Sequence, residues 1–410
     1  MRANGKFWSK YVLVLGSSGL TIILSFILNL IMTHTMVAEH YGFYRAYVNS
    51  TTTLCTLTSF GVALTASREF AIENTIQKKN EILKASYIVF LCIALIVFLL
   101  TIVIQLVLYL FGIKLPAYIL LASATVGLMF FNRLYLYKFQ GENNMLMYSI
   151  LTVVPQGSIT LIYIICFLLK IAVLEIWAII IYFFSYFIIL FVFFLVDFVK
   201  IKHAKKEIKK FLKCNSGYGF HLYIGGLASV ASAQVLNLLV ATLSGLEEYA
   251  YFTLGVSLAT PVMQIPAVMG TISFKENARI KKLSKSQIII TYSITFSATI
   301  IYAIFVKNVI CLLIGKEYIS ARPFALTMMI YYAVMGLGDF YNRFISAKGN
   351  GKDIRNSAFI TGASLIISAI IFIPLFRVKG VIISEIISGF VYLILMIFNY
   401  IKTIKNNNVV

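Results

Sequence analysis

Four basic side chains stand at the ends of long apolar stretches, where they could bind an anion: Arg68, Arg133, Lys275 and Arg343. A guanidinium group offers a planar fork of donors that matches phosphate oxygens, and an ammonium group attracts the same charge. The sequence therefore predicts an anionic headgroup as the ligand of these residues. A simpler interpretation stays open, because long basic side chains also reach from a membrane span to the interface for solvation alone.

Two acidic side chains, Asp339 and Glu385, lie inside apolar stretches instead of at their ends. A charge at the centre of a membrane span costs about 2.5–3.5 kcal/mol on insertion scales, so such a residue is a functional candidate. Glu385 has no local partner and could couple transport to the binding and release of a proton. Asp339 lies four residues before Arg343, a spacing that also suits a simple ion pair on one helix.

Small polar residues recur at helical spacing in the first apolar stretch and form a stripe along one face. The stripe consists of Ser18, Thr21, Ser25 and Asn29, and Asn237 and Gln264 hold comparable positions in the second half. This symmetric placement favours a hydrated central cavity lined by these side chains. Tight packing between helices uses the same residue types and is the alternative.

Catalytic and metal-binding patterns are missing from the sequence. There is no Walker A pattern, no acidic cluster that could hold a metal, and no loop long enough for a catalytic domain. The five cysteines show no short spacing, so neither a disulfide framework nor a metal site is indicated. We expect a protein that is not an enzyme and that uses no metal and no cofactor.

The elements that must position these residues are membrane-spanning helices. The 410 residues are 60% hydrophobic and 12% charged, whereas soluble domains are about 45–50% apolar and about 25% charged. A span needs about 20 mostly apolar residues. Twelve runs meet this requirement, at residues 11–33, 45–66, 86–110, 116–137, 148–169, 175–198, 218–243, 249–272, 287–306, 323–345, 356–376 and 380–401. The predicted fold class is an all-α polytopic membrane protein with about 12 transmembrane helices.

The distribution of basic residues predicts the orientation of these spans. With the N-terminus in the cytoplasm, 27 of the 35 Lys and Arg residues fall at cytoplasmic ends and loops. This bias follows the positive-inside rule, so both termini are expected in the cytoplasm. Most of the net charge of +20 then sets the topology, and no nucleic-acid partner is needed.

Short matches at a nearly constant offset divide the chain into two halves. At a shift of 207 residues Arg68-Glu69 meets Lys275-Glu276, and at a shift of 210 Asn132-Arg133 meets Asn342-Arg343. We expect two six-helix lobes related by a pseudo-two-fold axis along the membrane normal, as in transporters with parallel repeats. The predicted boundaries are 1–198 for the N-lobe, 199–215 for a linker and 216–410 for the C-lobe.

The predicted linker is strongly basic, with seven lysines between Lys200 and Lys213. Its apolar residues Ile201, Ala204, Ile208 and Phe211 recur on one face of a helix. The pattern favours an amphipathic helix on the cytoplasmic leaflet, with its lysines near anionic headgroups. A solvated charged loop is the alternative.

Four stretches of the chain resemble Wzx-type O-antigen and polysaccharide flippases, which belong to the multidrug/oligosaccharidyl-lipid/polysaccharide exporter superfamily. Tyr41-Gly42-Phe43-Tyr44 resembles the Y-G-x-Y turn of that family, and Gly61 followed by Arg68-Glu69 resembles its glycine and arginine at the end of span 2. The remaining stretches are Gly315-Lys-Glu-Tyr318 with Ala321, and Lys379-Gly380-Val-Ile with Ser384.

The resemblance implies alternating access by two helical lobes in a bacterial cytoplasmic (inner) membrane. It implies undecaprenyl-pyrophosphate-linked oligosaccharide as substrate, moved from the cytoplasmic to the outer leaflet, and a cationic cavity in which Arg68 matches the family's arginine. A polysaccharide polymerase and a chain-length regulator would be its partners beside the lipid bilayer. One departure concerns span 7, where the family often carries an acidic residue and this sequence has Gln234 and Asn237.

Two alternatives to a flippase remain open. A cation-coupled multidrug exporter of the same superfamily would prefer carboxylates in its cavity, and Asp339 and Glu385 are the candidates within spans. A membrane-embedded polysaccharide-assembly enzyme would normally carry a large outward loop with catalytic side chains, and no such loop occurs in the sequence.

Overall fold

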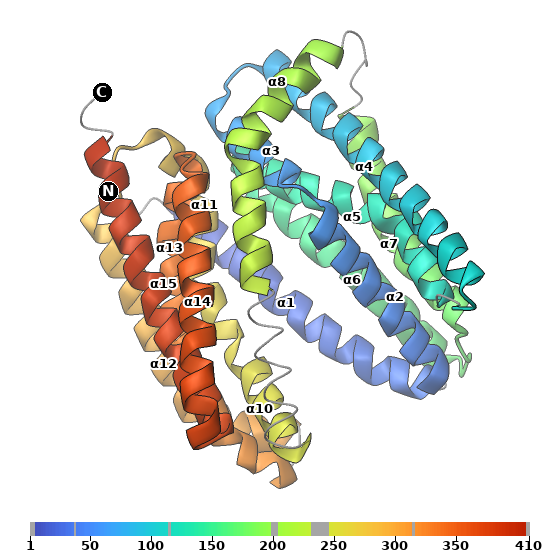
Figure 1. Cartoon of the computed structure of the whole chain (residues 1–410). Coiled ribbons are helices and arrows are strands. Elements are labelled where there is room, and N and C mark those ends of the chain that lie inside the picture. Colours follow the sequence, from blue (N-terminus) through green and yellow to red (C-terminus); the bar gives the residue numbers. More distant parts are fainter. Residues whose placement is uncertain are drawn as a thin grey trace. The chain divides into compact units, whose positions relative to one another are not determined.

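A computed structural model describes residues 5–36, 38–113, 116–197, 204–230, 246–313 and 316–406 of the chain. Throughout these ranges the regular structure is helical, which confirms the predicted all-α class (Figure 1). Ten of the described helices are long and apolar enough to cross a membrane. The chain divides into an N-terminal unit, Val12–Phe220, and a C-terminal unit, which joins Met1–Tyr11 to His221–Val410.

The helices of the N-terminal unit are α1 Gly5–Thr35, α2 Ala38–Thr58, α3 Val62–Ile72, α4 Ile76–Leu110, α5 Ala117–Glu142, α6 Met145–Leu168, α7 Glu175–Val196 and α8 Ala204–Gly217. Helix α5 is central, because α2, α3, α4, α6 and α7 all pack against it (Figure 1). Its contacts are rich in aromatic rings, and Phe130 stacks on Phe90 of α4 at 4.9 Å between ring centres. Large apolar side chains such as Leu95 and Leu99 cover the outer side of α4, as lipid contact requires.

A helix at Gly219–Val230 begins in the last residues of the N-terminal unit and continues into the C-terminal unit. The further helices of the C-terminal unit are α10 Leu246–Ala259, α11 Pro261–Arg279, α12 Lys285–Leu313, the 3-10 helix η1 Lys316–Ala321, α13 Arg322–Ala347, α14 Gly351–Phe376 and α15 Val378–Asn406. Helix α13 packs against α10, α11, α12 and α15, and α14 packs against α15. Part of the predicted span 218–243 lies outside the described residues.

One predicted span is a broken helix, which corrects its assignment as a single run. Span 45–66 is interrupted between α2 and α3, where Phe60 and Gly61 adopt positive φ angles of 44° and 75°. Span 249–272 continues past Pro261, which stands in the first turn of α11 after Thr260 in a helical conformation, so that Leu254–Arg279 is one candidate span. The Tyr41–Tyr44 stretch also differs from the expected turn, since it lies within the first turns of α2.

Two further differences concern the cytoplasmic side of the prediction. Helix α4 begins at Ile76, ten residues before the predicted span at 86, so its first turns carry the lysines that follow Glu73. A helix, α8, does occupy part of the basic linker. Its apolar residues Phe211 and Ile208 pack into the hydrophobic core of the N-terminal unit, so protein covers them instead of lipid.

The break before α3 depends on a contact between two backbones. A Cβ atom at Gly61 would lie 2.1 Å from the carbonyl oxygen of Gly219, and a Cβ at Gly219 would lie 2.5 Å from the carbonyl oxygen of Gly61. Backbone atoms cannot rotate away as a flexible side chain can. Both positions therefore require glycine. At Gly61 the left-handed backbone conformation is a second reason for glycine.

We predict that Gly61→Ala destabilises the protein strongly, because the new methyl group meets backbone and the left-handed conformation alone costs about 1–2 kcal/mol. Thermal unfolding of the purified protein in detergent measures the effect. Gly16→Ala in α1 is the matched control, since a Cβ there has no neighbour within 4 Å. Equal melting temperatures for the two variants would contradict the described contact.

Candidate functional site

The four predicted basic residues occupy two pairs of packed helices. Arg68 on α3 and Arg133 on α5 belong to the N-terminal unit, in which α3 packs against α5. Lys275 on α11 and Arg343 on α13 belong to the C-terminal unit, in which α11 packs against α13. Each unit thus brings two of the predicted cations onto neighbouring helices.

The guanidinium group of Arg68 lies over the ring of Tyr218, with 5.3 Å between its central carbon and the ring centre. One of its terminal nitrogens donates to the Glu69 carboxylate at 3.3 Å. Its Nε atom is enclosed and has no hydrogen-bond partner among the described residues. The side chain is 26% exposed, so it retains donor capacity while it is held by protein on one side.

Arg133 faces the polar run of α2. Its Nη2 atom donates to the hydroxyl of Thr56 at 2.8 Å, and that hydroxyl donates in turn to the carbonyl oxygen of Thr52 at 2.8 Å. The arginine is half-buried, and Thr52 is exposed. The interaction orients the guanidinium along the threonine-rich face of α2.

Lys275 and Arg343 are half-buried in the C-terminal unit. The aliphatic part of Arg343 covers Gly270 of α11 so closely that a Cβ at Gly270 would lie 2.8 Å from its Cγ atom. The absence of a side chain at Gly270 therefore sets how closely the arginine stem approaches α11.

The two predicted coupling carboxylates lie at the contact between α13 and α15. Asp339 accepts a hydrogen bond of 2.7 Å from the hydroxyl of Tyr392, which itself accepts one of 2.8 Å from the amide of Asn342. The Oε2 atom of Glu385 is enclosed and has no hydrogen-bond partner among the described residues. Tyr331 and Tyr332 of α13 are its titratable neighbours.

The polar stripe of α1 is tied largely to neighbouring backbone and helices. The hydroxyls of Ser18 and Thr21 donate to carbonyl oxygens one turn earlier, and Thr21 also approaches the carbonyl oxygen of Thr152 on α6 at 3.5 Å. Asn29 accepts hydrogen bonds from Tyr41 at 3.2 Å and Arg45 at 3.4 Å.

The other predicted cavity residues that the structure describes differ in their burial. Ser25 is half-buried on α1 and Gln264 is exposed on α11, whereas Asn237 lies outside the described residues. Whether these side chains line a hydrated cavity stays a prediction.

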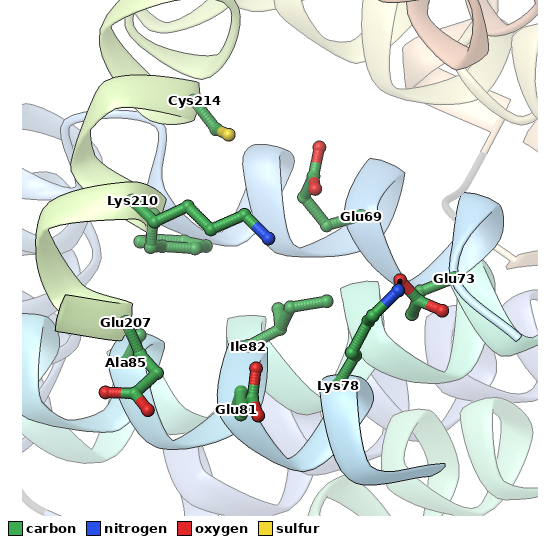
Figure 2. Close-up of a pocket in the computed structure, with 10 residues that line it drawn as sticks. Glu69, Glu73, Lys78, Glu81, Ile82, Ala85, Glu207, Lys210 and Cys214 are labelled. Carbon is green, nitrogen blue, oxygen red and sulfur yellow. Dashed lines mark ion pairs between the residues drawn. The ribbon is translucent and has the colours of Figure 1, made fainter. Parts of the chain in front are cut away.

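Sequence reasoning did not identify a charged pocket on the N-terminal unit, between α3, α4 and α8 (Figure 2). Four carboxylates and two ammonium groups line it: Glu69, Glu73, Glu81, Glu207, Lys78 and Lys210. Hydrogen bonds from the backbone amides of Thr75 and Asn74 lower the pKa of Glu73. Burial, helped by the nearby Glu69 carboxylate, raises the pKa of the Cys214 thiol. The surplus of carboxylates makes this pocket unsuitable for an anion.

Sequence reasoning also missed the residues at the end of α8 that hold α3. Asn215, which is 7% exposed, accepts a hydrogen bond of 2.7 Å from Thr65 and donates one of 2.9 Å to the carbonyl oxygen of Phe60. Tyr218, one turn further along, lies under Arg68. The glycines on either side of Tyr218 were the only local sign of a close backbone approach in this stretch.

Known proteins resemble this chain in sequence and in fold. The model of the polysaccharide biosynthesis protein family matches residues 7–275, about two thirds of the chain. No curated protein matches the chain. Among solved structures, a MATE protein in complex with MaD3S has a TM-score of 0.76 at 14% identity and covers 98% of this chain and 96% of its own.

Two further solved structures share the fold over nearly the whole chain. An outward-facing multidrug resistance MATE family transporter of the MOP superfamily has a TM-score of 0.69 at 15% identity, covering 97% of this chain and 96% of its own. A MOP superfamily transporter from Pyrococcus furiosus has a TM-score of 0.69 at 12% identity, with coverage of 97% and 96%. These likenesses confirm the predicted fold class of an all-α polytopic protein.

We predict that Asn215→Ala lowers the free energy of unfolding by about 1–3 kcal/mol, because it removes the hydrogen bonds that Asn215 makes with the carbonyl oxygen of Phe60 and with the buried Thr65 hydroxyl. Chemical unfolding in mixed micelles measures this loss. The neighbouring Ser216→Ala is the control, since Ser216 is exposed and bonds only within its own helix turn, to the carbonyl oxygen of Lys213. A loss of similar size in both variants would contradict the role given to Asn215.

Proposed function

Because the chain belongs to the polysaccharide biosynthesis protein family, we propose that this membrane transporter flips undecaprenyl-pyrophosphate-linked oligosaccharide from the cytoplasmic to the outer leaflet. The observation that carries the proposal is the position of the family match. It spans three of the four cationic residues, Arg68, Arg133 and Lys275, and so includes both packed helices of the N-terminal pair.

The chemistry of the substrate explains why such residues are needed. A pyrophosphate cannot enter hydrocarbon alone, since burying an isolated charge costs tens of kcal/mol on the Born estimate. Arg68 keeps an enclosed Nε atom without a partner and is partly exposed, so it can exchange part of its interaction with Glu69 for a phosphate oxygen. The polyprenyl tail stays in lipid while the basic residues replace the water of the headgroup.

The direction of transport has a physical driver. Moving one charge through 100 mV is worth about 2.3 kcal/mol, and an anionic headgroup leaving an inside-negative cell moves downhill. The proposed setting is therefore a bacterial cytoplasmic membrane with both termini inside and alternating access between the two lobes. A polysaccharide polymerase and a chain-length regulator would act on the flipped product.

A multidrug exporter is the second candidate, favoured by the fold shared with a multidrug resistance transporter. Such a protein needs carboxylates that are free to meet a cationic drug. Asp339 already accepts a hydrogen bond from Tyr392, whereas the enclosed Oε2 atom of Glu385 has no hydrogen-bond partner among the described residues. The family match favours the flippase, and the neighbours in fold named here are transporters, consistent with a protein that is not an enzyme.

We predict that the double variant Arg68→Ala, Lys275→Ala lowers surface polysaccharide about tenfold or more, because each lost charged hydrogen bond is worth about 1.5–3 kcal/mol. The measurement is polysaccharide on whole cells whose chromosomal copy is deleted, with protein level checked by immunoblot. Lys402→Ala is the control, since Lys402 is an exposed cation paired with Asp353 at 2.9 Å. Normal polysaccharide in the double variant at normal protein level would refute the proposed anion site.

We predict that Glu385→Gln abolishes the acceleration of flipping by an imposed pH gradient in proteoliposomes. An enclosed carboxylate oxygen without a partner must be neutralised by a proton or a cation in a membrane, and glutamine cannot exchange either. Glu81→Gln is the control, because Glu81 lies in the charged pocket near the start of α4. Persistence of the acceleration in Glu385→Gln would remove Glu385 from the coupling step.

A further inference from the structure

We propose that Tyr218, backed by Asn215, is the positioning residue of the anion site, because its ring holds the Arg68 guanidinium in place without neutralising it. The inference rests on the proposed function of Arg68 and adds a residue from the segment that follows α8. It assigns to this segment a part in substrate affinity, beyond its part in connecting two halves of the chain.

The first observation is the geometry of the ring and the cation. The Arg68 guanidinium carbon lies 5.3 Å from the centre of the Tyr218 ring, within the range of a cation–π interaction. Tyr218 is 5% exposed, so this ring is fixed by its surroundings instead of following the arginine. The arginine side chain is more exposed than the ring that supports it.

The second observation is the register between α3 and the end of α8. The Thr65 hydroxyl donates to the side-chain oxygen of Asn215 at 2.7 Å. Three residues further along both segments, Arg68 meets Tyr218. The same two segments are thus joined by a hydrogen bond and by the cation–π pair. The Asn215 contact therefore helps to hold the end of α8, and with it Tyr218, against α3.

The third observation is the charge around Arg68. Glu69 already supplies one carboxylate at 3.3 Å. A second carboxylate in place of Tyr218 would orient the guanidinium equally well but would cancel its charge. An aromatic ring attracts the cation through its quadrupole and brings no net charge. The ring thereby orders the guanidinium in advance without adding a second negative charge, so a pyrophosphate has to compete with the Glu69 carboxylate only.

The test uses the full-length protein in lipid nanodiscs and undecaprenyl pyrophosphate as the probe, with its dissociation constant as the readout. Tyr218 is replaced by phenylalanine and by phenylalanine analogues of increasing fluorination, which weaken the ring quadrupole at nearly constant shape. We expect Tyr218→Phe to retain most of the affinity. The dissociation constant should then rise stepwise, to about three- to tenfold for the most fluorinated ring and for Tyr218→Leu.

A double-mutant cycle separates positioning from a structural effect. In an Arg68→Ala background the fluorination series should leave the dissociation constant unchanged, because the cation that the ring holds is gone. Fluorinated analogues at Tyr163 are the matched control, since that ring is fully buried and its hydroxyl approaches the sulfur of Met36. These should bind the probe as the unmodified protein does.

The outcomes that overturn the inference are distinct from those that overturn the proposed function. If Arg68→Ala weakens binding but the dissociation constant does not change with fluorination at Tyr218, the anion site stands and the positioning role is refuted. If fluorination at Tyr218 raises the dissociation constant equally in the Arg68→Ala background, the ring acts through the fold and the positioning role is also refuted. If Arg68→Ala binds the probe normally, the proposed function itself fails.

Discussion

The contact between the backbones of Gly61 and Gly219 is the constraint on which the N-terminal unit depends. At this contact α2 ends and α3 begins as a separate helix. The contact also places the carbonyl oxygen of Phe60 where the Asn215 amide donates a hydrogen bond to it. A continuous helix over this stretch would have carried Arg68 to a different height and face. The energetic cost of the broken helix is offset by the Asn215 amide, which binds a carbonyl group freed by the break.

In the C-terminal unit, buried polar groups are paired by hydrogen bonds between side chains. Asn342, Tyr392 and Asp339 form a chain of hydrogen bonds between α13 and α15, so the aspartate is satisfied where it lies. On the same pair of helices, the enclosed Oε2 atom of Glu385 has no hydrogen-bond partner among the described residues. The two carboxylates therefore differ in their surroundings, although they lie on the same pair of helices.

The sequence predicted the long helices well, because hydropathy is a local property. The expected span 148–169 corresponds to α6 at Met145–Leu168, and 116–137 to α5 at Ala117–Glu142. The break at Gly61 escaped prediction, because its cause is a glycine far away in the chain. The same holds for the site. Arg68 was predicted as a candidate from its charge at the end of a span, whereas its contact with Tyr218 depends on the tertiary structure. The apolar face of α8 was predicted from its periodicity. That this face packs on protein and not on lipid depends on tertiary contacts, which the periodicity does not contain.

The Asn215 bond also bears on the order in which this protein is made. Its partners are separated by 150 residues in one case and by 155 in the other. A chain emerging from the ribosome therefore inserts α1 to α7 before the residue that completes the α2–α3 break has been synthesised. During that interval the hydrogen bond between the Asn215 amide and the carbonyl oxygen of Phe60 has not yet formed. The contacts of Arg68 and Thr65 with Tyr218 and Asn215 can therefore form only after α8 has been made, and not when α3 itself is inserted.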